Sequence, residues 1–258
     1  MSALAVPNYS SYIICGTPRS GSTLMCEMLA VTGVAGRPNS YYRQPSLEYW
    51  ADIWGVAHPN GIDDPAFERA YHAAMLREGT NGTGIFGLRL MWSSVANASR
   101  RLNGIYGGPA DITTRFEQAF GKPLYVHLSR HDKVAQAISR LRAEQSGLWH
   151  LAADGSVFEG TESPQPVAYD EARLAAFFTE LKSDDAAWEA FFQTHKIEPL
   201  RLTYETMTDH PQPALASILA ALFRDPEIAK TIDVGTAKMA DATSREWSDR
   251  FRKENGLS

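Results

Sequence analysis

The residues best suited to chemistry form a short loop near the start of the chain. Residues 17–23 read Thr-Pro-Arg-Ser-Gly-Ser-Thr and supply one guanidinium group, several hydroxyl groups and a glycine. Arginine can bind an oxyanion through two parallel hydrogen bonds, and the backbone N–H groups that open a helix also favour an anion. The loop therefore predicts an oxyanion site. Its candidate binding residues are Arg19, Ser20, Gly21, Ser22 and Thr23.

The segments on either side of the loop predict how it is held. Residues 12–15 are β-prone or readily buried, and Leu24, Met25, Met28 and Leu29 follow at helical spacing. This order predicts a strand, a loop and a helix. The nucleotide-triphosphate pattern G-x-x-x-x-G-K-[ST] is not matched, because Gly21 stands where its lysine would be. A β-α turn rich in glycine and serine can also be no more than a turn.

The rest of the chain repeats this arrangement. Four strand-like stretches, each followed by a helical pattern, cover residues 12–15, 84–92, 124–128 and 197–205. They predict an α/β fold with a mostly parallel central sheet flanked by helices and with ligand loops at the carboxyl ends of the strands. We expect one domain over residues 1–258. Residues 145–167 are rich in Gly, Ser and Pro, and such a stretch is usually a lid, a binding loop or disordered.

Composition excludes several classes of function. The net charge of −5 disfavours nucleic acid as the main partner, because binding a phosphate backbone needs a broad basic face. No apolar run approaches the ~20 residues that span a bilayer, and the first residues do not resemble a secretion signal, so we expect a cytoplasmic protein. Cys15 and Cys26 are interpreted as buried thiols. The seven histidines show no metal-binding spacing, so no metal is expected.

Several motifs together resemble a known enzyme family. The segment TPRSGSTLMCEMLAVTGVAG resembles the 5′-phosphosulfate loop of sulfotransferases that use 3′-phosphoadenosine-5′-phosphosulfate (PAPS). The segments TGVAG, GLRLMW and SREWSDRFR resemble in particular the bacterial trehalose 2-sulfotransferase family, over about residues 11–253. The resemblance implies a P-loop nucleotide-kinase-like sulfotransferase fold and a homodimer. It implies transfer of a sulfuryl group from PAPS to a hydroxyl of a carbohydrate or glycolipid acceptor.

The resemblance also assigns residues to the donor. It implies that Arg130, at a strand end, and Ser139, on the next helix, clamp the 3′-phosphate of PAPS, and that Tyr204 lies near the adenine. Arg245 and Trp247, in the C-terminal tail, would face the adenine or the 3′-phosphate. Each has an ordinary alternative: a surface arginine beside a helix serine, a tyrosine that closes the core, and a solvated basic helix.

The catalytic assignments are less complete. Arg19 would hold the transferring sulfuryl group, assisted by Arg89 where the family has a lysine. The family's general base is a glutamate, and alignment from TGVAG places Ser40 there, which cannot act as a base. Glu48 is the nearest candidate in sequence and His58 the second.

The aromatic residues Tyr49, Trp50 and Trp54 suit a sugar ring and a helix packed on a sheet equally well. Two other functions stay open. The absent glutamate is compatible with a catalytically impaired protein that binds PAP, the desulfonated donor. A P-loop small-molecule kinase is disfavoured by the missing Gly-Lys-Ser/Thr.

Overall fold

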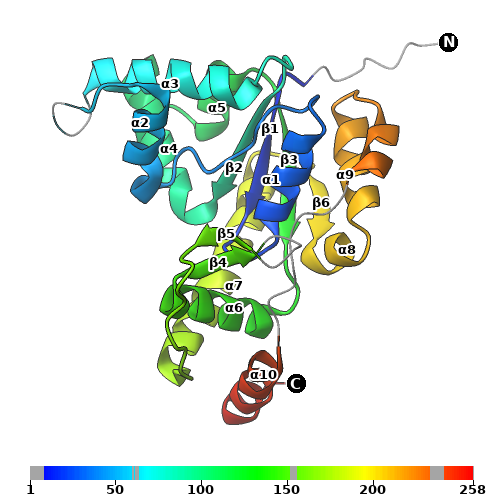
Figure 1. Cartoon of the computed structure of the whole chain (residues 1–258). Helices are drawn as coiled ribbons and strands as arrows, with labels where there is room; N and C mark the ends of the chain where they lie inside the picture. Colours follow the sequence, from blue (N-terminus) through cyan, green and yellow to red (C-terminus); the bar gives the residue numbers. More distant parts are fainter. Residues whose placement is uncertain (1–8, 60, 62–63, 152–155, 233–240, 258) are drawn as a thin grey trace.

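The structure is a computed structural model that describes residues 9–59, 61, 64–151, 156–232 and 241–257. Its centre is a sheet of four parallel strands: β1 (Ser11–Gly16), β2 (Phe86–Met91), β3 (Pro123–Ser129) and β6 (Leu200–Thr203), in the order β2-β1-β3-β6. Figure 1 shows the strands side by side between layers of helices. The predicted α/β fold with a parallel sheet is confirmed.

Both faces of the sheet are covered, as a parallel sheet requires. On one face, Ile13 and Cys15 pack with side chains of α2 (Leu47–Trp54), α3 (Pro65–Thr80), α4 (Trp92–Tyr106), α5 (Ile112–Phe120) and α7 (Glu171–Thr194). On the other face, Tyr12 and Ile14 pack with α1 (Ser22–Val31), α8 (Tyr204–Asp209) and α9 (Pro211–Ala221). The alternation along β1 therefore feeds two apolar clusters, because successive side chains of a strand point to opposite faces.

A third apolar cluster joins α6 (Lys133–Ser146), α7 and the C-terminal helix α10 (Ala242–Asn255). Two short 3₁₀ helices, η1 (Gln44–Ser46) and η2 (Pro226–Thr231), complete the helical elements of the described residues. Cys15 and Cys26 are buried free thiols. Among the helices the structure describes, none is both long and apolar enough to cross a membrane.

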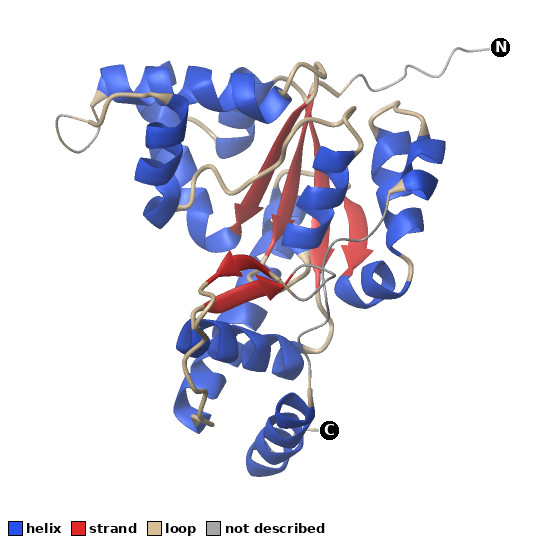
Figure 2. Ribbon diagram, viewed as in Figure 1, coloured by secondary structure: helices blue, strands red, loops and turns tan. Residues whose placement is uncertain are grey.

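The stretch 145–167 contains an antiparallel hairpin, β4 (Leu148–Leu151) and β5 (Val157–Gly160). Figure 2 shows this hairpin beyond the carboxyl ends of the central strands, separate from the main sheet. Its register shifts at His150, so the two strands pair irregularly. The hairpin thus approaches the edge of the sheet where the ligand loops of an α/β fold gather.

Candidate functional site

The loop between β1 and α1 has a backbone that favours an anion. Arg19 and Gly21 have positive φ angles of 64° and 84°. Gly21 is the N-cap of α1, no side chain caps this helix end, and its first turn holds no acidic residue. The N–H groups of the first helical turn have no intrahelical partner and carry the positive end of the helix dipole. The strand, loop and helix predicted from the sequence are confirmed.

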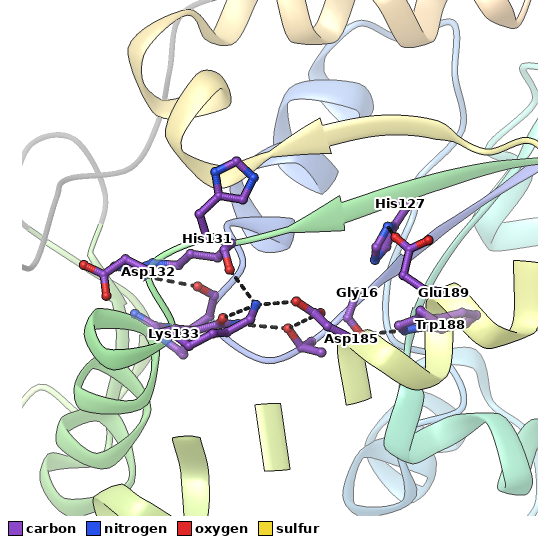
Figure 3. A network of polar contacts seen from close by, with 12 residues as sticks. Gly16, His127, His131, Asp132, Lys133, Asp185, Trp188 and Glu189 are labelled. Atoms are coloured by element: carbon purple, nitrogen blue, oxygen red, sulfur yellow. Dashed lines mark hydrogen bonds and ion pairs between the residues drawn. The ribbon is translucent and has the colours of Figure 1, made fainter. Parts of the chain in front are cut away.

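Polar contacts from three directions fix this loop. Gln136 Nε2 donates to Pro18 O at 2.7 Å and to Thr17 Oγ1 at 2.9 Å. Trp188 Nε1 donates to Gly16 O at 3.0 Å. Figure 3 shows the ion pair of Lys133 and Asp185 within the same network, next to the contact of Trp188 with Gly16. A left-handed Arg19 costs about 1–3 kcal/mol, and the fixed surroundings make that conformation tolerable.

The Arg19 side chain is the hub of the site. Its Nε donates to Ser139 Oγ at 2.9 Å, and its Nη1 donates to Trp149 O at 2.6 Å. Arg130 Nη1 donates to Arg19 O at 3.3 Å, and the Arg130 guanidinium lies 4.1 Å from the centre of the Tyr204 ring. The structure therefore brings together Arg19, Arg130, Ser139 and Tyr204, which come from three separate parts of the sequence.

The two arginines create an excess of positive charge. Burial, together with the neighbouring Arg130, lowers the pKa of the Arg19 guanidinium to about 10. Burial also lowers the pKa of Arg130. Both shifts mean that the charged forms are held at a cost. An anion bound between them would offset that cost, because an opposite charge favours the charged form.

Two further polar atoms fit such a ligand. Within the described part of the chain, Ser20 Oγ and Arg130 Nε are buried and have no hydrogen-bond partner. Buried polar atoms in native proteins are nearly always paired, so each one here suits a group that the protein alone does not supply. Both belong to residues predicted to bind the donor.

Arg89 lies beside the same loop. It donates from Nη1 to Thr23 Oγ1 at 2.6 Å and from Nε to Ser40 Oγ at 2.7 Å. Asn39 holds the Ser40 segment against β2. The backbone carbonyl of Asn39 accepts a hydrogen bond from Arg89 N at 3.0 Å, and Asn39 forms an isolated parallel β-bridge with Leu88. Position 40, where the family has its glutamate, therefore faces the arginine that was expected to assist transfer.

These groups border a cavity of about 570 Å³. Its lining comes from the β1–α1 loop, α1, the end of β2, the region of α2, and the β4–β5 hairpin. Arg140 and Glu144 of α6 also line it. The lining includes Arg19, Thr23, Glu27, Ser40, Arg43, Ser46, Tyr49, Trp50, Arg89, Trp149, His150 and Glu159. Tyr49 is 58% exposed, whereas Trp50 also packs edge-on against the buried Tyr41 with ring centroids 5.3 Å apart. The aromatic stretch thus packs on the core, as a helix on a sheet does, and also exposes ring surface to the cavity.

Other predicted residues lie elsewhere. Glu48 is exposed on α2 and lines a second cavity of about 330 Å³, together with His58, and neither is among the residues that line the first cavity. His58 Nε2 lies 2.7 Å from Asp52 Oδ1. The structure contains nothing that tests Glu48 as a base, so that assignment stays a prediction.

The tail is a helix docked on α6. Asp241 pairs with Arg142, and Arg252 Nη2 donates to Asp132 Oδ1 at 2.7 Å, in the loop that follows β3. Trp247 is only 6% exposed and belongs to the third apolar cluster, while Arg245 is exposed. Neither residue is among those that line the first cavity, and their donor contacts stay predictions.

Sequence reasoning missed His150 and Glu159. Both line the cavity from the hairpin, with His150 Nδ1 2.8 Å from Glu159 Oε2. The only signal was a histidine in a Gly- and Ser-rich stretch, which by itself predicts nothing. Among the described residues, no group of three or more His, Cys, Asp or Glu could hold a metal ion.

Comparisons with known proteins identify the family of this chain. A family model described as Stf0 sulphotransferase matches residues 11–254. The trehalose 2-sulfotransferase of Mycobacterium tuberculosis (strain ATCC 35801 / TMC 107 / Erdman) is 28% identical over 260 residues, 94% of each chain. That of Mycolicibacterium smegmatis (strain ATCC 700084 / mc(2)155) is 27% identical over 263 residues, 95% of each chain.

Among solved structures, the sulfotransferase domain of the Synechococcus PCC 7002 olefin synthase covers 97% of this chain and 98% of its own, with 14% identity and a TM-score of 0.45. That likeness is too distant to bear on the site. The family match spans nearly the whole chain and includes the oxyanion loop, Arg89, Arg130 and the docked tail. The expected resemblance is confirmed, and the chain belongs to the Stf0 sulfotransferase family and is a sulfotransferase enzyme.

Proposed function

We propose that this enzyme transfers a sulfuryl group from PAPS to a hydroxyl of a carbohydrate acceptor. The observation that carries the proposal is the pair of neighbouring, partly buried arginines, Arg19 and Arg130, beside the open N-terminus of α1. A donor that carries two separate anionic groups suits two neighbouring cations. The names of the two relatives make trehalose the first acceptor to test.

The proposed roles combine the family resemblance with the position of each side chain. Arg19 and the N–H groups of residues 20–23 hold the 5′-phosphosulfate and neutralise charge on the oxygens of the transferring group. Arg89 supports them from β2 through Thr23. Arg130 and Ser139 hold the 3′-phosphate, and Tyr204 lies near the adenine. As in phosphoryl transfer, the protein mainly places the groups in line and stabilises charge.

The acceptor would enter along the aromatic wall of the cavity. Tyr49 and Trp50 present ring surface next to Arg43 and Ser46, and apolar ring faces flanked by polar groups suit a sugar. A hydroxyl of that sugar would approach the sulfuryl group from the side opposite the nucleotide. Glycolipids with an exposed sugar headgroup belong to the same class of acceptor.

Calorimetry and a transfer assay test the proposal together. We expect PAP to bind and ATP not to bind, and labelled sulfate from PAPS to appear on trehalose or another sugar in a panel of free sugars and glycolipids. Binding of ATP alone would instead support a small-molecule kinase. PAP binding with no transfer to any acceptor would support a binding protein. This second candidate is favoured by Ser40, which accepts a hydrogen bond from Arg89 and cannot act as a base.

Two expectations about the enzyme in solution accompany this function. A homodimer and a cytoplasmic location stay predictions. Light scattering on the purified protein checks the first, since a monomer has a mass of 28.5 kDa. Fractionation of the native host cell checks the second.

A further inference from the structure

The β4–β5 hairpin brings a histidine and a carboxylate to the cavity. Neither side chain has a role in the function proposed above. We propose that His150, oriented by Glu159, is the general base that removes the proton from the acceptor hydroxyl. This inference rests on the proposed function. It gives the enzyme a base that does not depend on a glutamate at position 40.

The contacts of His150 fix the state of its ring. Nε2 lies 2.9 Å from Arg19 Nη1, and Nδ1 lies 2.8 Å from Glu159 Oε2. Arginine can only donate, so Nε2 must accept and carries a lone pair. Nδ1 therefore carries the proton and donates a hydrogen bond to the Glu159 carboxylate. A basic nitrogen of a cavity-lining residue thus lies against the group proposed to hold the sulfuryl.

This arrangement is the one that makes a histidine an effective base. A carboxylate on Nδ1 holds the ring orientation and stabilises the imidazolium that forms when Nε2 takes a proton. Charged groups reach His150 from three elements: Glu159 on β5, Arg19 in the loop and Arg89 on β2. Burial and the two arginines lower the pKa of His150, whereas Glu159 opposes the shift. The ring is therefore neutral and available at neutral pH.

The other acidic residues of the cavity fit the role less well. Glu144 is held by Arg140 at 3.0 Å and by Arg173 at 2.9 Å. Glu27, on α1, has its pKa raised by burial but has no contact with Arg19 among the described interactions. Of the candidate bases, His150 is the one in direct contact with the arginine proposed to hold the transferring group.

The acceptor O–H gives its proton to His150 Nε2, and its oxygen forms a bond to sulfur. The bond from sulfur to the bridging oxygen of the 5′-phosphate breaks, and PAP leaves with that electron pair. For Nε2 to be free, Arg19 Nη1 must turn from it to the sulfuryl oxygens, an exchange that a charge-assisted hydrogen bond to an anion favours. The base is then released only when the donor is bound.

The test compares His150→Asn and Glu159→Gln with the wild type. PAP affinity, measured by calorimetry, should stay within about threefold in both variants. The rate of transfer should fall about 10²–10⁴-fold in His150→Asn, the usual contribution of a general base. Glu159→Gln should move the acidic limb of the pH–rate profile to lower pH, because loss of the carboxylate lowers the pKa of the imidazole. A merely structural role would not move that limb.

Matched controls are available on the surface. His210→Gln and Glu162→Gln alter exposed residues of the same types and should leave the rate unchanged. A wild-type rate in His150→Asn with PAP still bound would overturn the inference but not the proposed function. So would a full loss of transfer in Glu27→Gln or Glu48→Gln together with an active His150→Asn. If the wild type neither binds PAP nor transfers sulfate, both proposals fail.

A folding defect would not hide the answer. If His150→Asn loses thermal stability, the pH profile of Glu159→Gln decides, since it retains the histidine and the hydrogen-bonding shape of the side chain. An unshifted limb in that variant would count against the inference.

Discussion

Replacing Gly21 by alanine should damage both the fold and donor binding, by an amount that the structure allows us to work out. Gly21 has a φ of +84°, and an added Cβ would lie 2.3 Å from Met207 Cε and 3.0 Å from Tyr204 Cδ2. The left-handed backbone costs an alanine about 1–2 kcal/mol, and overpacking adds about 1–3 kcal/mol. The expected loss of 2–5 kcal/mol lowers the melting temperature of a chain this size by about 5–15 °C.

Gly33 provides a matched control just beyond the C-terminal end of the same helix. It has a φ of +68°, and an added Cβ would meet nothing within 4 Å. Gly33→Ala therefore carries only the backbone cost of about 1–2 kcal/mol. The difference between the two variants isolates the clash with α8.

The clash should also reach the donor. Tyr204 lies under the Arg130 guanidinium at 4.1 Å, so displacing its ring displaces a cation proposed to bind phosphate. We expect calorimetry to show at least a tenfold loss of PAP affinity in Gly21→Ala and none in Gly33→Ala. Combining Met207→Ala with Gly21→Ala should cost less stability than the sum of the two single losses, because the truncated side chain no longer meets the added Cβ. Equal melting temperatures and equal PAP affinities for the two glycine variants would refute this reasoning.

The local part of the site could be predicted from the sequence. The apolar run 12–15, the small residues of the loop and the helical spacing after it lie within one stretch, so pattern and propensity agree. The parallel order of the strands follows from the repeated strand and helix units. The resemblance predicted Ser139 only as a partner of Arg130. Its contact with Arg19, 120 residues away, was not predicted, because no local pattern encodes it.

The hairpin could not be predicted for a physical reason. Its strands are four residues each, pair with a shifted register and add nothing to the main sheet. Their sequence therefore carries neither a long apolar run nor a clean alternation. His150 and Glu159, the proposed base and its partner, therefore lie in the stretch where the hydrophobic pattern predicts structure least well.

Two placements on helices could have been read from spacing. Leu47 and Ala51, four residues apart, are buried on α2, which turns the adjacent Glu48 away from that face. Trp247 and Phe251 make the same four-residue pair on α10, and both are buried. Proximity in sequence favoured Glu48 and the motif favoured Trp247, whereas helical periodicity tells only which face of each helix is buried, so both proposed roles stay predictions.

The remaining predictions concern the second anion site and the buried charges. Arg130→Met should weaken PAP binding by about 10–10³-fold but weaken adenosine 5′-phosphosulfate binding far less, because only PAP carries the 3′-phosphate; calorimetry with both ligands checks this, and equal losses would contradict it. Glu68→Gln should destabilise the fold by about 3–5 kcal/mol in denaturant unfolding, because Arg101, 2.7 Å away and 1% exposed, would keep an uncompensated buried charge. Glu78→Gln, at an exposed pair, should change stability by less than about 1 kcal/mol. Burial, reinforced by Arg101, lowers the pKa of His72 to about 4, below that of the unfolded chain near 6.5, so its neutral ring contributes stability above pH ~6.5 that is lost as the pH falls towards 4. That loss should reach about 3 kcal/mol at pH 4 relative to a His72→Asn variant, which cannot titrate. Parallel pH profiles of the unfolding free energy for the two proteins would show that the buried imidazole is not the source.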